Sequence, residues 1–156
     1  MDVKWVRPKS IHITLKFLGD TPTSKIEQLA DAAQNAVGGF APFTVSIEGT
    51  GGFPSERRPR VLWIGIHEGD EKLVQLAVLI NKALTPLGFA LEKRPFSPHV
   101  TIGRVRSLKN IDQVVQKMKA LDLAEKFPVN TIEFIKSDLK PTGAEYTVLK
   151  EIHMKT

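Results

Sequence analysis

Residues 11–17 read I-H-I-T-L-K-F, and residues 98–104 read P-H-V-T-I-G-R. Apolar and polar residues alternate in both stretches, which predicts two half-buried strands, at residues 10–19 and 99–105. Side chains at positions i and i+2 of a strand project from the same face. We therefore expect His12 to lie beside Thr14, and His99 beside Thr101, each pair turned away from the apolar residues. These pairs are the first and the second His-x-Thr motif.

The rest of the chain predicts a mixture of helices and strands. Segments with a single apolar stripe predict helices at residues 23–37, 70–87 and 110–123, the first of them capped by Thr23 or Ser24. Other apolar segments predict strands at residues 3–6, 43–48, 61–66, 89–92, 129–139 and 145–152, with a turn at 7–9, a long loop at 49–60 and a hairpin loop at 140–144.

This order of elements contains no repeated βαβ unit and no linker. It indicates one α+β domain, residues 1–156, with a largely antiparallel sheet and helices on its outer side. A His-x-Thr strand followed by a helix occurs twice, about half the chain apart. We therefore expect two similar lobes that face each other, with both motifs converging in one cleft.

Charge and composition narrow the classes of partner. The 22 Lys and Arg residues outnumber the 17 Asp and Glu residues, for a net charge of +5. This favours either a polyanionic partner or a solvated basic surface. The absence of cysteine excludes disulfides, a thiolate nucleophile and Cys-ligated zinc. The sequence shows neither an apolar run long enough for a bilayer nor the apolar core of a signal peptide, so we expect a cytoplasmic protein that binds no membrane.

Two imidazoles with two hydroxyls suit phosphodiester chemistry on RNA. An imidazole has an unperturbed pKa of about 6.5, so one can take a proton while the other gives one at neutral pH. The Thr hydroxyls, with nearby cations, can hydrogen-bond the phosphate oxygens as charge develops. This scheme requires no metal or cofactor. Zinc binding by the two histidines is the alternative, but no third ligand is evident. His67 and His153 lack the accompanying Thr, and we expect them at the surface or at strand ends.

Three stretches carry a family resemblance. Residues 5–20 (W-V-R-P-K-S-I-H-I-T-L-K-F-L-G-D), 96–105 (F-S-P-H-V-T-I-G-R-V) and 137–149 (S-D-L-K-P-T-G-A-E-Y-T-V-L) resemble the two-histidine (2H) phosphoesterases. Among these, the chain is most similar to the RNA 2′,3′-cyclic phosphodiesterases, also called 2′-5′ RNA ligases. The resemblance implies a bilobal fold with a pseudo-twofold central cleft. It also implies hydrolysis of a terminal 2′,3′-cyclic phosphate to a 2′-phosphate, with 2′-5′ ligation as the reverse reaction, His12 as proton donor and His99 as proton acceptor.

Other residues are candidates for binding the substrate. Arg104 follows Thr101 by three, so strict alternation places it on the wrong face, but a bend at Gly103 would turn it toward a phosphate; the alternative for Arg104 is a structural salt bridge. Phe96 is a candidate for stacking a base, and Tyr146 for lining the cleft. Arg60, with other loop cations, either reaches an RNA strand or forms a solvated rim; these cations are Arg57, Arg58, Lys93 and Arg94.

Family members usually have a further strand and helix before the segment that starts at Trp5. Lacking them would expose a sheet edge, which makes a homodimer that fills the gap an expectation. Two alternatives to RNA-end hydrolysis stay open. One is a phosphodiesterase for another cyclic-phosphate or 2′-5′-linked nucleotide, and the other is a catalytically weak module that binds RNA ends.

Overall fold

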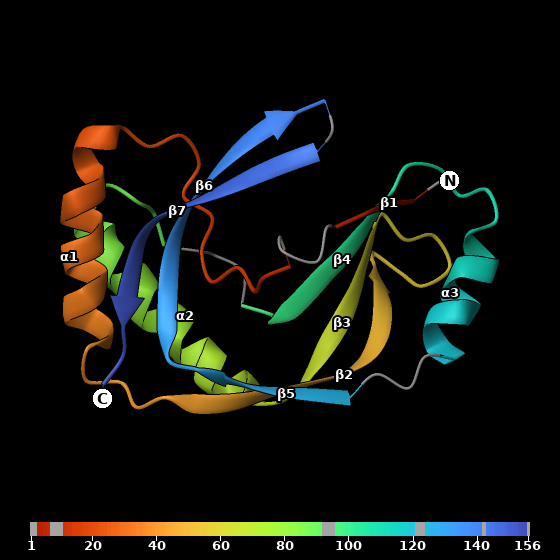
Figure 1. The fold of residues 1–156 in the computed structure, drawn as a ribbon, viewed down its shortest axis with the longest axis horizontal. Helices are drawn as coiled ribbons and strands as arrows, with labels where there is room; N and C mark the ends of the chain where they lie inside the picture. Colours follow the sequence, from red (N-terminus) through yellow and green to blue (C-terminus); the bar gives the residue numbers. More distant parts are fainter. Residues whose placement is uncertain (1–2, 7–10, 92–95, 121–123, 142, 156) are drawn as a thin grey trace. The chain divides into compact units, whose positions relative to one another are not determined.

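The computed structural model describes residues 3–6, 11–91, 96–120, 124–141 and 143–155. The expected turn at residues 7–9, and Lys93 and Arg94, lie outside these ranges. The chain combines helices with antiparallel strand pairs, which confirms the α+β fold class (Figure 1). In chain order they are β1 (Val3–Trp5), η2 (Thr23–Lys25), α1 (Ile26–Val37), β2 (Phe43–Phe53), β3 (Val61–Glu68), α2 (Asp70–Leu84), η3 (Thr85–Leu87), β4 (His99–Val105), α3 (Ile111–Ala120), β5 (Ala124–Val129), β6 (Thr131–Lys140) and β7 (Gly143–His153).

The chain divides into two compact units. Unit 1 comprises Met1–Ile13, Val45–Asp70 and Pro98–Phe127, and unit 2 comprises Thr14–Thr44, Glu71–Ser97 and Pro128–Thr156. Unit 1 contains α3 and most of a five-stranded sheet with the order β1-β4-β3-β2-β5. Unit 2 contains α1, α2 and the two-stranded sheet of β6 and β7. The two units therefore differ in their content of helices and strands.

The core of unit 1 lies between its sheet and α3. Val3 and Leu62 from the sheet pack with Ile111 and Met118 of the helix, and all four are buried. Ile102 and Val105 of β4 add to this cluster. Adjacent side chains of a strand point to opposite faces of the sheet. The helix α3 therefore covers one face of β4, and the remaining side chains of β4 lie on the other face.

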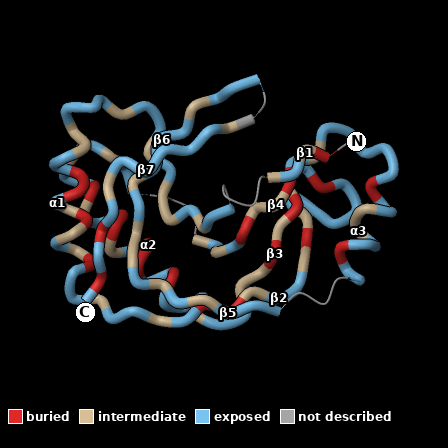
Figure 2. The backbone as a smooth tube through the Cα atoms, viewed as in Figure 1, coloured by how far each residue is buried: buried red, intermediate tan, exposed pale blue. Residues whose placement is uncertain are grey.

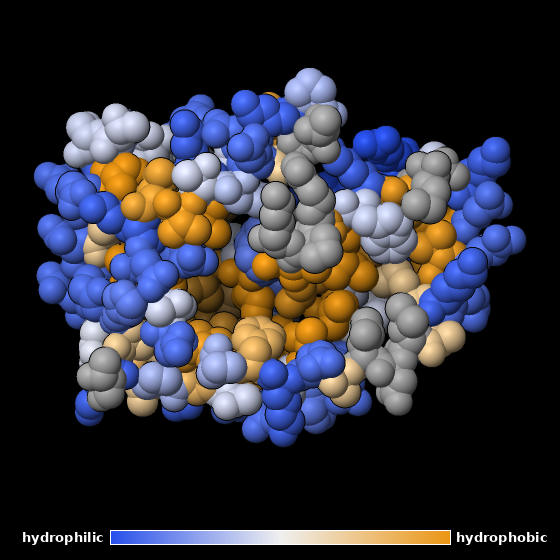
Figure 3. Space-filling view, in the orientation of Figure 1, coloured by the Kyte–Doolittle hydropathy of each residue, from blue (hydrophilic) through white to orange (hydrophobic). Residues whose placement is uncertain are grey.

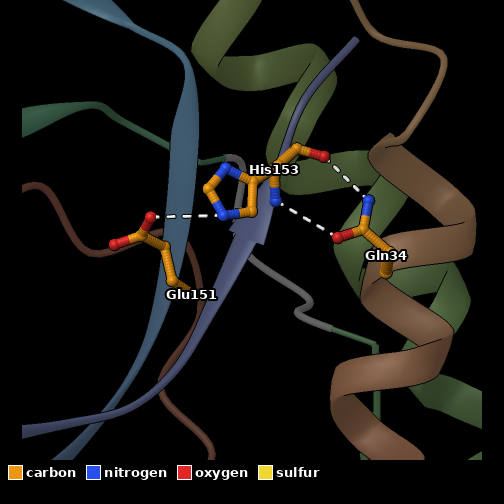
Figure 4. Close-up of polar contacts among 3 residues, drawn as sticks. All are labelled: Gln34, Glu151 and His153. Carbon is orange, nitrogen blue, oxygen red and sulfur yellow. Dashed lines mark hydrogen bonds and ion pairs between the residues drawn. The ribbon is translucent and has the colours of Figure 1, made fainter. Parts of the chain in front are cut away.

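Unit 2 has its own core, in which α1 and α2 pack together with β7. Residues coloured as buried lie on the facing sides of these elements (Figure 2). The buried cluster of this core includes Leu29, Leu76, Leu84 and Ile152. The outer sides of α1 and α3 are mostly hydrophilic (Figure 3). The side-chain amide of Gln34 on α1 makes two hydrogen bonds to the backbone of His153 on β7. Nε2 donates to the carbonyl of His153 at 2.7 Å, and Oε1 accepts from its N–H at 3.1 Å (Figure 4).

The first motif does not lie on a strand, contrary to the sequence prediction. Residues 11–19, all of which are described, form no strand. A strand requires a neighbour for its backbone N–H and C=O groups, and alternation of apolar residues cannot supply one. The alternation also fails for Phe17, which is 79% exposed although it has the parity of the apolar residues. Lys16 anchors the segment instead, because Nζ donates to Oδ1 of Asn81 at 2.6 Å and to the carbonyl of Ala90 at 2.9 Å.

Three further predictions need correction. β2 continues to Phe53, through residues expected in a loop, because Gly49 adopts a φ of +78° and the register shifts around it. Residues 89–91 form no strand, while β5 was not predicted and is separated from β6 at Asn130. Neither Thr23 nor Ser24 caps α1 through its side chain, because the short helix η2 precedes α1 and Lys25 occupies the cap position.

None of the helices in the described part of the chain combines the length and the apolar character that a membrane span requires.

Candidate active site

The second motif lies on β4, which pairs on one side with β1 and on the other with β3. His99 is opposite Gly65, and Thr101 is opposite Trp63. Val100 between them is 4% exposed, so the strand alternates between a buried and an open face. His99 and Thr101 share the open face, as the sequence predicts, and we call it the motif face of the sheet.

A β-bulge on β4 brings Arg104 to this same face. Leu62 pairs with Gly103, but the next residue, Trp63, pairs with Thr101, so Ile102 is an extra residue on β4. A bulge of this kind shifts the alternation by one position. Gly103 therefore joins the buried face, and Arg104, opposite Val61, joins the motif face. The sequence predicts that a bend at Gly103 turns Arg104 to this face; in the structure the bulge at Ile102 does so, while Gly103 itself stays paired with Leu62 and Trp5.

Lys4 was missed by sequence reasoning. On β1 it is directly opposite Arg104, so both cations project from the motif face. Like charges opposite one another destabilise a sheet. The ion pairs found within the described ranges involve other cations. Lys4 and Arg104 are therefore placed to bind an anion together. The sequence carries no local signal for this pairing, since the two residues are far apart along the chain.

Trp63 also belongs to the motif face, beside Thr101. Its indole lies across Gly51 on β2, where an added Cβ would come within 2.7 Å of the ring atom Cε2. Only glycine leaves room for the ring at this place. The motif face thus carries an aromatic side chain, half-buried, next to the polar side chains of β4.

The first motif has a different setting. His12 belongs to unit 1, while Thr14 is the first residue of a segment of unit 2, so the boundary between the units falls inside the motif. Both residues are exposed. Lys16, two positions after Thr14, fixes the segment to α2 through Asn81, whose own amide donates to the carbonyl of Ala77 at 2.8 Å.

The other predicted substrate ligands are not gathered on β4. Phe96 lies in the loop before β4, within unit 2. Tyr146 lies on β7 opposite Ser137, also within unit 2. Arg60 precedes β3, and its carbonyl accepts from the N–H of Val105 at 2.8 Å. The binding roles of all three stay predictions.

His67 and His153 are found where the sequence predicts them. His67 is exposed near the end of β3, with Nδ1 3.8 Å from Oε2 of Glu48. His153 is the last residue of β7, with Nε2 3.3 Å from Oε1 of Glu151 (Figure 4). Within the described part of the chain, no group of three or more His, Cys, Asp or Glu side chains is placed to hold a metal ion.

Known proteins resemble this chain over nearly all of its length. An RNA 2′,3′-cyclic phosphodiesterase of Aquifex aeolicus is 36% identical over 154 residues, which cover 97% of this chain and 81% of the relative. An enzyme of the same name from Methanothermobacter thermautotrophicus is 34% identical over 147 residues, or 93% of this chain and 79% of the relative.

Solved structures agree on the fold. A protein of Thermus thermophilus superposes with a TM-score of 0.82 at 27% identity, covering 99% of this chain and 83% of that one. The E. coli protein LigT, solved with 3′-AMP, superposes with a TM-score of 0.75 at 22% identity, over 99% of this chain and 83% of LigT. The profile of the 2′-5′ RNA ligase superfamily matches residues 3–141, and the chain belongs to this family.

Proposed function

We propose that this protein hydrolyses the 2′,3′-cyclic phosphate at RNA ends to a 2′-phosphate. The observation that carries the proposal is the motif face of β4, where a bulge aligns His99 and Thr101 with Arg104, opposite Lys4. An imidazole, a hydroxyl and two cations on one face of the sheet suit a phosphate diester. Membership of the superfamily, and relatives named RNA 2′,3′-cyclic phosphodiesterase, support the same substrate class.

The proposed reaction uses the two imidazoles in turn. His99 accepts a proton from a water molecule as its oxygen attacks phosphorus. The bond between phosphorus and the 3′ oxygen breaks, and His12 gives a proton to that leaving oxygen. The phosphate stays on the 2′ oxygen. The same steps, with a 5′ hydroxyl in place of water, form a 2′-5′ linkage, and this ligation is the reverse of the cleavage of a 2′-5′ linkage. The assignment of donor and acceptor follows the family resemblance.

Negative charge accumulates on the non-bridging oxygens as water attacks. Donors that already point at these oxygens lower the barrier, because they need no reorganisation during the reaction. Thr101 and Arg104 have this role in the proposal, and Lys4 adds a second positive charge. The role of Thr14 rests on the repeated motif alone. Arginine suits this position because its planar guanidinium binds two phosphate oxygens at once.

Product analysis tests the proposal. An oligonucleotide that ends in a 2′,3′-cyclic phosphate is incubated with the protein, with and without EDTA, and the products are compared with 2′- and 3′-phosphate standards. We expect only the 2′-phosphate, at the same rate in EDTA. A 3′-phosphate would contradict the roles of the two histidines. Salt-sensitive binding without turnover would identify an RNA-end binding module, and turnover of other 2′-5′-linked or cyclic substrates alone would move the activity to that class. The homodimer and the cytoplasmic location stay predictions.

A further inference from the structure

The motif face continues beyond β4 onto β3 and β2. Arg104 is opposite Val61, and Val61 is opposite Phe53, so these residues form one row across three strands. Lys4 extends the row onto β1. Side chains that are directly opposite one another share a face of the sheet. The row therefore has two cations at one end and an aromatic ring at the other.

Phe53 is open to solvent, with 62% of its surface exposed. A single exposed apolar side chain is ordinary on a protein surface, so the exposure alone identifies nothing. The neighbours of Phe53 distinguish it. The indole of Trp63 covers Gly51, which precedes Phe53 by two positions and shares its face. Two aromatic side chains thus occupy successive places along β2, on the face that carries the catalytic motif.

The distance from Thr101 to Phe53 on this face is larger than a single nucleotide spans. Neighbouring strands lie about 4.8 Å apart and successive residues rise about 3.4 Å, which puts the Cα of Phe53 roughly 12 Å from that of Thr101. Trp63 is only one strand away from Thr101. A phosphate held by Thr101 and Arg104 therefore leaves the base of its own nucleotide near Trp63. The next base along an RNA strand is the one that reaches Phe53.

From this arrangement we propose that Phe53 stacks the base of the nucleotide preceding the one that carries the cyclic phosphate. Phe53 then makes an oligonucleotide a better substrate than a mononucleotide. This inference rests on the proposed function. Stacking on an aromatic ring tolerates any base, since every base has a π-face. Phe53 accordingly detects the presence of a second nucleotide and not its identity.

A comparison of two substrates tests the proposal. kcat/KM is measured for a 2′,3′-cyclic mononucleotide and for a dinucleotide that ends in the same nucleoside cyclic phosphate. Phe53→Ala should lower kcat/KM about tenfold for the dinucleotide and leave the mononucleotide unchanged. Phe53→Tyr should keep the preference, whereas Phe53→Leu, which is apolar but has no ring, should lose it. Leu139→Ala, at a 90% exposed apolar residue of β6, is the matched control. An equal loss on both substrates, or no loss on the dinucleotide, would overturn the proposal.

A binding measurement separates this proposal from the activity. A trinucleotide with a terminal 2′-phosphate, the proposed product, carries 2-aminopurine at either the last or the second-last position, and its fluorescence falls when the base stacks. We expect quenching at the second-last position with the wild-type protein, and none with Phe53→Ala. If the wild-type protein hydrolyses neither cyclic substrate, the proposed function fails, and the fluorescence still decides the stacking. Unquenched fluorescence with the wild-type protein, or equal quenching with Phe53→Ala, would refute it.

Discussion

The two His-x-Thr motifs have similar sequences but are held in different ways. The second lies on β4, whose backbone is paired on both sides, and a bulge adds Arg104 to its face. The first lies in an irregular segment that is anchored through the side chain of Lys16. A motif therefore specifies which chemical groups are present, while pairing with distant parts of the chain determines how firmly these groups are held in place.

The largest expected effect concerns the two histidines. His99→Ala removes the proposed proton acceptor, and His12→Ala removes the proposed donor. Each should lower kcat by about 10³-fold, because general acid or base catalysis contributes on this order. Hydrolysis of a 2′,3′-cyclic nucleotide at saturating substrate is the measurement. Full activity of either variant would show that the two motifs do not both take part in catalysis. Full activity of His99→Ala would contradict the proposed mechanism altogether.

Arg104 and Lys4 test the added cations of the second motif. Arg104→Ala should lower kcat/KM roughly 100-fold, as the loss of a donor to a developing oxyanion does. Arg104→Lys should recover part of it, since lysine keeps the charge but not the two-pronged geometry. Lys4→Ala should lower kcat/KM by a smaller factor. The double variant should lower kcat/KM by less than the product of the two single factors, because both cations bind one phosphate.

Stability measurements distinguish the proposed anion-binding role of Lys4 and Arg104 from a purely structural role. Each alanine variant relieves the repulsion across the β1–β4 pair, so the melting temperature should stay constant or rise while activity falls. Lys109→Ala, at an exposed lysine before α3, is the control for a general loss of positive charge. A lower melting temperature with unchanged activity would show that Lys4 and Arg104 stabilise the sheet and bind no phosphate.

A smaller effect is expected from the anchor of the first motif. Lys16→Met keeps most of the side chain but removes its bonds to Asn81 and Ala90, and it leaves the oxygen of the buried Asn81 amide without this donor. The free energy of unfolding should fall by about 1–2 kcal/mol. Lys82→Met, at an exposed lysine of α2, is the matched control. Because Lys16 positions the segment of His12, kcat should also fall at temperatures where the variant is folded. An unchanged kcat would show that the first motif keeps its geometry without this anchor.

The sequence predicts the helices and strands that can be recognised from the pattern of neighbouring residues. β4 and the helix α2 have the expected positions because their apolar periodicity reflects the core each of them packs against. The pairing of each His with a Thr on one face also follows from local alternation, and it is confirmed for His99 and Thr101.

What the sequence does not predict depends on pairing between distant segments. The bulge at Ile102 exists only in the register of β4 against β3, and without it Arg104 has the wrong parity. Lys4 reaches Arg104 through β1, and Phe53 joins the same row through β2. Alternation also predicted a strand around His12, where the described residues form none, because the spacing of apolar residues does not specify a neighbouring strand.

The smallest expected effects concern the two histidines outside the motifs. His67→Gln and His153→Gln should change kcat/KM by less than about twofold, since exposed side chains outside a site tolerate replacement.

The hydrogen bonds between His153 and Gln34 use the backbone of His153, so His153→Gln leaves them intact. Gln34→Ala removes both bonds and should lower the free energy of unfolding by about 1 kcal/mol. Thermal melting and kcat/KM measured side by side check this. A loss in His153→Gln as large as in His99→Ala would show that a neighbouring Thr does not separate the catalytic histidines from the structural ones.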